Sequence, residues 1–242
     1  MATFVFVHGA WLGSWIWKKI LGPLRKKGHD VYAVTLTGMG DRVHLAREDF
    51  GMDTATQDVV NLLEYEDLHD VVLVGHSFAG KVISRVYDEV PERIKMLFYF
   101  DAFVPQKSRE PQGGIEQMSK DERGIIEKAV KAEGSGWKLG VPDEFLDDLA
   151  WDLKGDDKDW FFSKLTPWPS KLAFESIQVS EKVDKAKKAY IFCNRSWEDI
   201  EKQWKDFLDS LDGEYKLLVA AHYPMVTKVD ETIDALIALS KS

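Results

Sequence analysis

The chain has 242 residues, 45% of them apolar, and a formal net charge of -9 at pH 7. This length and composition suffice for one α/β domain with a sizeable core. The negative charge, without any basic cluster, excludes the phosphate attraction that nucleic-acid binding requires. No apolar run approaches 18 residues, no charged leader precedes the first apolar run, and the single Cys193 allows no internal disulfide. We expect a cytoplasmic protein without a membrane span or a nucleic-acid partner.

Apolar β-type runs alternate with helical patterns along the chain, which predicts a mostly parallel sheet with helices on both faces. The runs cover residues 3–7, 31–36, 71–74, 94–100, 188–193 and 215–220, and the helical patterns cover 14–27, 54–66, 78–90, 198–211 and 229–240. Thr54 and Gln57 have the spacing of a capping box, which places a helix start near residue 54.

The alternation stops between Pro105 and Pro167. A polar, Gly-rich opening leads there into short amphipathic stretches near 119–132, 143–153 and 157–165. We expect residues 105–166 to form a helical lid, inserted into a core made of residues 1–104 and 167–242. The lid contains large aromatic side chains, some of which should cover an apolar pocket. These are Trp137, Trp151, Trp160, Phe161, Phe162 and Trp168, the last just beyond the boundary.

Ser77 stands where an apolar run ends and a helical pattern begins, in the segment Gly75-His-Ser77-Phe-Ala-Gly80. This is a variant of the Gly-x-Ser-x-Gly nucleophile elbow, with Ala79 at the place of the second glycine. Such a turn exposes the serine hydroxyl, and flanking glycine avoids clashes around it. Ser77 is the candidate nucleophile.

A serine nucleophile needs a base, and histidine suits this role because it takes and returns a proton near neutral pH. Of the six histidines, only His222 follows Ser77, just after the run 215–220, where a strand should end. His222 is therefore the candidate base. His76, beside the nucleophile, is interpreted as a spacer whose side chain diverges from Ser77.

Acyl transfer also needs N–H donors aimed at the developing oxyanion. The residue after the nucleophile, Phe78, supplies one, and Ala10 in the loop after the first strand is the candidate for the second. The alternative is that the glycines of that loop only shape a turn. Gly9 and Trp11 flank Ala10, and we expect both to contact substrate, with Trp11 facing the cleft.

With these motifs in place, the chain resembles the α/β-hydrolase superfamily over nearly its full length. The closer resemblance is to the plant methylesterase and hydroxynitrile lyase branch, and the segment Thr35-Leu-Thr-Gly-Met-Gly-Asp-Arg42 is similar to bacterial carboxylesterase relatives. The motifs that carry the branch resemblance are His8-Gly-Ala-Trp-Leu-Gly-Ser-Trp-Ile-Trp17, Gly75-His-Ser-Phe-Ala-Gly80, Asp101-Ala-Phe-Val-Pro105 and Tyr190-Ile-Phe-Cys193. The resemblance implies an α/β-hydrolase fold and ester chemistry.

Two positions separate ester hydrolysis from cyanohydrin cleavage within this branch. The resemblance implies that a lyase has threonine at the position of Gly9 and lysine at the position of Tyr223, directly after the catalytic histidine. This chain has neither group. We therefore expect ester hydrolysis and no lyase activity.

The acid of the triad departs from the pattern of the branch. Relatives have an aspartate three residues after the cysteine of the Tyr-x-x-Cys strand, whereas Ser196 occupies that position here. Three alternatives stay open: Asp101 at a neighbouring strand end, Glu198 or Asp199 farther along the loop, or no acid at all.

These residues together predict a serine carboxylesterase that hydrolyses small to medium uncharged esters through an acyl-enzyme. The expected partner is a small-molecule ester, and no metal or other cofactor is implied. One rival function is a thioesterase or acyltransferase, because a thioester forms the same acyl-enzyme. A second rival is a hydrolase-like receptor with weak turnover, which the altered loop after Cys193 favours.

Overall fold

The structure is a computed structural model that describes residues 1–105, 110–114, 118–142, 149–196, 198, 205 and 208–241. Its centre is a six-stranded sheet with spatial order β2-β1-β3-β4-β7-β8, in which every neighbouring pair is parallel. The strands are β1 (Thr3–Val7), β2 (Asp30–Val34), β3 (Val71–His76), β4 (Ile94–Phe100), β7 (Lys188–Asn194) and β8 (Glu214–Val219). The six predicted runs are thus confirmed, each within two residues.

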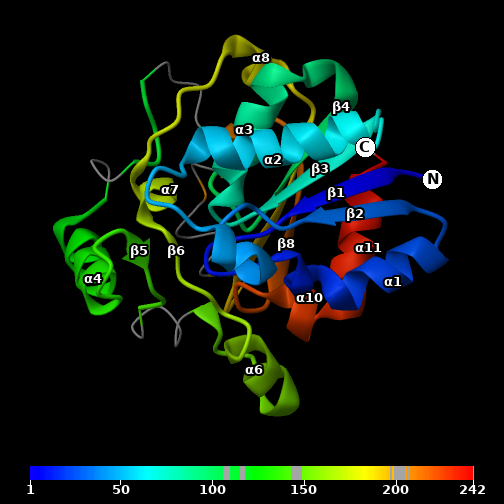
Figure 1. Cartoon of the computed structure of the whole chain (residues 1–242). Helices are drawn as coiled ribbons and strands as arrows, with labels where there is room; N and C mark the ends of the chain where they lie inside the picture. The colour runs from blue at the N-terminus through cyan, green and yellow to red at the C-terminus, as the bar shows by residue number, and fades with distance from the viewer. Residues whose placement is uncertain are drawn as a thin grey trace.

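Helices cover both faces of the sheet, as the alternating pattern predicted. α2 (Met52–Tyr65) and α3 (Ala79–Glu89) lie over one face, and α1 (Lys18–Lys26) and α11 (Val229–Leu239) over the other (Figure 1). Shorter helical segments are Ser14–Trp17, Gly40–Leu45, Pro91–Arg93 and α10 (Pro224–Thr227).

The two hydrophobic cores follow from the period of two along each strand. In β1, Val5 and Val7 belong to the core under α2 and α3, whereas Phe4 and Phe6 belong to the core under α1 and α11. All four side chains are fully buried. Because both faces are covered, these strands have to be apolar on both sides.

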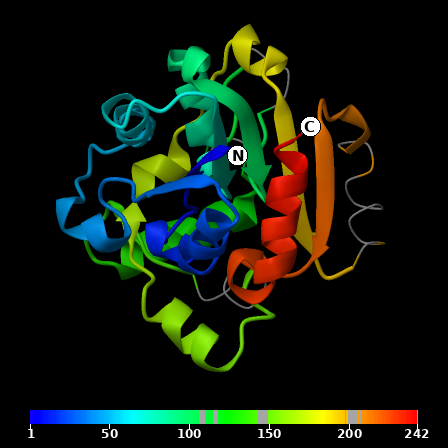
Figure 2. The ribbon, with the colours of Figure 1, turned by 90° about the vertical axis from the view of Figure 1, so that its right-hand side faces the viewer.

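The described residues between β4 and β7 lie outside the six-stranded sheet. They form α4 (Lys120–Ala132), the antiparallel pair β5 (Lys138–Leu139) and β6 (Trp168–Pro169), α6 (Gly155–Phe162), α7 (Ser170–Phe174) and α8 (Glu181–Lys185). Figure 1 shows α4, β5, β6 and α6 beyond the sheet on the side away from the chain termini, which is the side of the carboxyl ends of the strands; Figure 2 shows the same core turned. We refer to residues 105–166 as the insertion; its exact boundaries stay a prediction.

The start of α2 differs from the prediction. The helix begins at Met52 with Gly51 as its N-cap, so the capping box predicted for Thr54 and Gln57 is wrong. The carboxylate of Glu175, distant in sequence, accepts the Met52 N–H at 2.6 Å. A negative charge at this end of a helix satisfies a free amide and interacts favourably with the helix dipole.

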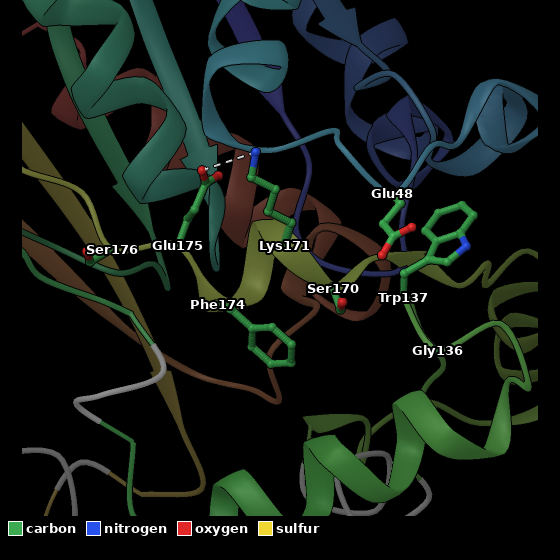
Figure 3. A pocket seen from close by; sticks show the side chains of 8 residues that line it. All are labelled: Glu48, Gly136, Trp137, Ser170, Lys171, Phe174, Glu175 and Ser176. Atoms are coloured by element: carbon green, nitrogen blue, oxygen red, sulfur yellow. Dashed lines mark ion pairs between the residues drawn. The ribbon is translucent and has the colours of Figure 1, made fainter.

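A hollow of about 550 Å³ lies beside the insertion (Figure 3). Lys171 forms an ion pair with Glu175 at 3.7 Å in its wall, so these two charges neutralise each other. The hollow is lined by Glu48, Gly136, Trp137, Ser170, Lys171, Phe174, Glu175 and Ser176. The candidate catalytic residues are not part of this wall. Among the described residues, no helix is long and apolar enough to cross a membrane.

Candidate active site

Ser77 occupies a strained turn between β3 and α3. Its φ of 58° lies in the left-handed region, which residues other than glycine rarely adopt and which costs on the order of 1–3 kcal/mol. The Ser77 carbonyl accepts the N–H of Gly80 at 3.2 Å and stabilises the turn. A Cβ on Gly75 would lie 2.7 Å from the carbonyl oxygen of Ala79. Glycine at position 75 therefore lets α3 start this close to β3.

Asp101 and His222 meet at the carboxyl edge of the sheet. Oδ2 of Asp101 accepts a hydrogen bond from Nδ1 of His222, and Oδ1 accepts the backbone N–H of Cys193 at 3.0 Å. Both side chains are largely buried. With its proton on Nδ1, the His222 ring presents Nε2 as a base.

His76 connects His222 to the elbow. Its ring is fully buried, and Nε2 donates to the carbonyl oxygen of His222 at 2.9 Å. Burial, followed by the proximity of His222, lowers the pKa of His76 well below its usual value, so the ring is neutral. Because His76 directly precedes Ser77, this bond places His222 beside the elbow. His76 is thus more than the spacer predicted from the sequence.

The loop after β1 lies directly against the elbow. A Cβ on Gly9 would stand 2.6 Å from Nδ1 of His76 and 3.0 Å from Cβ of Ser77. Only glycine permits this approach without a shift of the neighbouring groups. Gly9 is buried, and this close contact brings the next residue, Ala10, to the nucleophile.

His8 fixes the orientation of the peptide between Gly9 and Ala10. Its Nε2 accepts the N–H of Leu36 at 3.1 Å, so the proton lies on Nδ1, which donates to the Gly9 carbonyl at 2.8 Å. Burial lowers the pKa of His8 to about 4, and the ring is neutral. In a trans peptide the C=O and N–H point in opposite directions. Holding the Gly9 oxygen therefore also fixes the direction of the Ala10 N–H.

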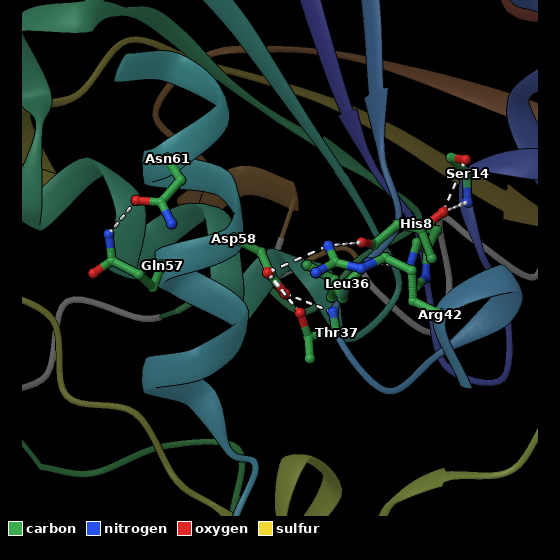
Figure 4. Close-up of polar contacts among 9 residues, drawn as sticks. His8, Ser14, Leu36, Thr37, Arg42, Gln57, Asp58 and Asn61 are labelled. Carbon is green, nitrogen blue, oxygen red and sulfur yellow. Dashed lines mark hydrogen bonds and ion pairs between the residues drawn. The ribbon is translucent and has the colours of Figure 1, made fainter. Parts of the chain in front are cut away.

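Figure 4 shows the contacts that hold the segment carrying Leu36. Asp58 on α2 accepts the N–H of Thr37 at 2.6 Å and its hydroxyl at 2.8 Å. Arg42 donates to the Thr35 carbonyl at 3.0 Å and lies 3.5 Å from Asp58. The segment 35–42, singled out in the sequence, is thus held in the position from which the N–H of Leu36 donates to His8.

The two candidate oxyanion donors have no competing partner in the described part of the chain. Neither the Ala10 N–H nor the Phe78 N–H donates a hydrogen bond to another described residue. Phe78 packs its ring on Trp168, with centroids 4.7 Å apart. Both amides can therefore donate to a substrate oxygen.

Trp11 points toward the insertion. Its indole N–H donates to the carbonyls of Gly140 at 2.9 Å and Leu139 at 3.2 Å, and its ring contacts Trp168 edge-on. The side chain is 8% exposed, so it forms part of the wall between the core and the insertion. A contact of Trp11 or Gly9 with substrate stays a prediction.

Of the two alternative acids, the structure describes only Glu198. Glu198 is exposed, and Asp199 lies outside the described residues, as does most of the predicted helix 198–211. The thiol of Cys193 lies beside Asp101, and burial, reinforced by that carboxylate, raises its pKa well above the usual value. Cys193 is thus a structural residue of β7.

Sequence reasoning missed Lys81, which joins the elbow helix to the segments around the insertion. Its ammonium group donates to the carbonyls of Gly113 at 2.9 Å, Glu175 at 2.9 Å and Leu172 at 3.3 Å. Burial lowers its pKa to about 8, and the Glu175 carboxylate opposes this shift. A lysine within the apolar start of α3 was the available signal, because a buried ammonium needs such partners.

This fold and this arrangement of residues are those of an α/β hydrolase. The model of the alpha/beta hydrolase family matches residues 4–235, and the chain belongs to that family, as the sequence motifs predicted. Solved structures agree on the fold. An extracellular alpha/beta-hydrolase from a Paenibacillus species superimposes with a TM-score of 0.84 over 100% of both chains at 24% identity. A methylesterase from Arabidopsis superimposes with a TM-score of 0.77 over 98% of both chains at 21% identity.

Curated relatives include esterases from bacteria and plants and an alpha-hydroxynitrile lyase from Arabidopsis thaliana, which is 34% identical over 45% of this chain and 42% of the relative. A carbendazim hydrolyzing esterase from Nocardioides sp. (strain SG-4G) is 37% identical over 172 residues, which are 69% of each chain. Polyneuridine aldehyde esterase from Rauvolfia serpentina is 25% identical over 258 residues, covering 99% of this chain and 96% of the relative. These relatives support ester hydrolysis and a small-molecule ester as substrate.

Proposed function

We propose that this protein is a serine carboxylesterase for small to medium uncharged esters. The observation that carries the proposal is the connected set Asp101, His222, His76 and Ser77. Asp101 orients the His222 ring, and His76 holds the His222 backbone beside the elbow. Ser77 is the nucleophile, His222 the base and Asp101 the acid.

In the first half-reaction, Nε2 of His222 takes the proton of the Ser77 hydroxyl as the serine oxygen attacks the ester carbonyl carbon. The N–H groups of Phe78 and Ala10 bind the oxygen that becomes negative. The tetrahedral intermediate collapses, the alkoxide takes the proton from His222, and the alcohol leaves. Ser77 is then acylated.

In the second half-reaction, His222 takes a proton from water, and the hydroxide oxygen attacks the acyl carbon. The intermediate collapses, Ser77 regains its proton from His222, and the carboxylic acid leaves. Every step is a proton or acyl transfer among the residues named and water, so the cycle requires no cofactor.

The proposal is tested with p-nitrophenyl acetate and butyrate and with a fluorophosphonate label. We expect wild-type turnover and the addition of one label per chain, and we expect Ser77→Ala to lose both. Labelling of Ser77→Ala at full stoichiometry would show that another residue is the nucleophile. Carbendazim belongs in the substrate panel, because a relative covering two thirds of the chain is named for its hydrolysis.

The rival functions differ in measurable ways. Turnover of acyl thioesters with a higher kcat/KM than the matching oxygen esters would indicate a thioesterase. The second rival, a hydrolase-like receptor with weak turnover, was favoured by the absence of an aspartate in the loop after Cys193. The contact between Asp101 and His222 provides an acid from another strand and favours turnover instead.

A further inference from the structure

The backbone of His222 is bound from two sides. On the core side, its carbonyl oxygen accepts the His76 Nε2 hydrogen at 2.9 Å. On the other side, its N–H donates to the carbonyl of Leu149 at 3.0 Å, and Leu149 belongs to the insertion. The insertion therefore contacts the proposed base itself, through its backbone.

Asp152 adds a second contact from the same part of the insertion. Its Oδ2 accepts the N–H of Ala221 at 3.0 Å and the hydroxyl of Thr227 at 2.9 Å. Ala221 directly precedes His222, and Thr227 is the last residue of α10, which follows it. One carboxylate oxygen thus contacts the backbone just before His222 and the last residue of the short helix after it.

We propose that Asp152 is a positioning residue for His222. Through Asp152, the insertion keeps the base in the position that proton transfer requires. This inference rests on the proposed roles of Ser77 and His222. Asp101 orients only the ring, whereas Asp152 and the Leu149 carbonyl fix the backbone that carries the ring. Displacing a catalytic group by about 1 Å can cost about a hundredfold in rate. The insertion accordingly contributes to the position of the catalytic base.

In these contacts Asp152 acts through an oxygen atom that accepts hydrogen bonds, and its negative charge is not required. Variants that keep or remove the oxygen test this. Asp152→Ala removes the acceptor for both Ala221 and Thr227. Asp152→Asn keeps an amide oxygen that can accept the same hydrogens. Thr227→Val removes only the hydroxyl and leaves the bond to Ala221. Asp159→Ala, which removes an exposed carboxylate on α6, is the matched control.

With p-nitrophenyl butyrate, we expect Asp152→Ala to lower kcat by about ten- to a hundredfold with KM changed less than about threefold. Asp152→Asn and Thr227→Val should stay within about threefold of the wild-type kcat, and Asp159→Ala should match the wild type. Equal loss in the Ala and Asn variants, or a wild-type kcat in Asp152→Ala, would overturn the proposal. If Asp152→Ala does not fold, Asp152→Glu, which displaces the carboxylate by one methylene, must show the same selective loss of kcat.

A second measurement does not depend on catalysis. Amide hydrogen exchange at Ala221 and His222 should be at least about tenfold faster in Asp152→Ala than in the wild type, and unchanged in Asp159→Ala. Amides of β3 serve as the internal reference. Faster exchange in Asp152→Ala, found together with a wild-type protein that hydrolyses no ester, would refute the proposed function and support the coupling. Unchanged exchange at both amides would refute the coupling, whatever the activity.

Discussion

The carboxylate of Asp101, at the end of β4, hydrogen-bonds His222, in the loop after β8, across the intervening strand β7. The backbone of β7 takes part, because the N–H of Cys193 donates to the other oxygen of Asp101. This contact supports the proposal that the acid of the site comes from β4 rather than from the loop after Cys193.

Replacing Asp101 by asparagine should remove most of the turnover. The amide keeps the shape but can hold His222 in the wrong tautomer; in the serine-protease example of this substitution, kcat falls by about 10⁴. We expect Asp101→Asn to lower kcat for p-nitrophenyl esters by about 10³- to 10⁴-fold, with an unchanged circular dichroism spectrum.

The alternative acids provide the control for that experiment. Glu198→Gln and Asp199→Asn should each change kcat by less than about tenfold. A nearly fully active Asp101→Asn together with an inactive Asp199→Asn would place the acid in the loop after Cys193. If all three variants remain active, a neutral group holds His222.

A methyl group at position 9 should damage the proposed oxyanion hole. The new Cβ of Gly9→Ala would meet His76 at 2.6 Å and push the loop that carries Ala10 away from Ser77. Loss of one oxyanion donor costs about 10²- to 10³-fold in kcat, and we expect a drop of this size. Gly22→Ala in α1 is the control, because its Cβ would meet no atom within 4 Å. Wild-type kcat in Gly9→Ala would argue against Ala10 as a donor.

The protein should release no cyanide from mandelonitrile above the buffer rate. Gly9 has no hydroxyl to bind the cyanohydrin, and Tyr223 is a buried phenol rather than a cation, its pKa raised by burial. Cyanide can be followed colorimetrically at matched pH without enzyme. Enzyme-dependent release that disappears in Ser77→Ala would show lyase activity.

The buried histidines should make the fold sensitive to acid. The pKa of His8 is about 4 in the fold and 6.5 in the unfolded chain, so the unfolded state binds more protons between these pH values. The free energy of unfolding should therefore fall as the pH drops from 6.5 to 4, by about 3 kcal/mol for His8 alone. Burial of His76 acts in the same direction.

Urea unfolding at pH 4.5 and pH 7 measures this dependence. His8→Gln cannot take up the proton and should lose less stability on acidification than the wild type. His44→Gln, at an exposed position, is the control and should follow the wild type. A pH dependence of His8→Gln equal to that of the wild type would contradict the assignment.

Most of the fold could be predicted from the sequence, because strands and turns depend on the properties of neighbouring residues. Apolar runs such as 94–100 become mostly buried parallel strands because a sheet covered on both faces favours apolar residues. The turn around Ser77 could also be predicted from local sequence, because glycine at position 75 permits a close approach that other residues block. Ser77 and His222 could be proposed as nucleophile and base because strand ends in such a sheet meet at one edge.

Contacts between distant segments could only be decided by the tertiary structure. Nothing near Met52 shows that Glu175 will accept its N–H, and nothing near Cys193 shows that Asp101 will hydrogen-bond His222. Asp152, in the insertion, likewise meets Ala221 only after the chain has folded. The physical reason is common to all three cases. A carboxylate binds whichever N–H group the packed chain brings within about 3 Å, and packing, unlike local periodicity, leaves no signature in neighbouring residues.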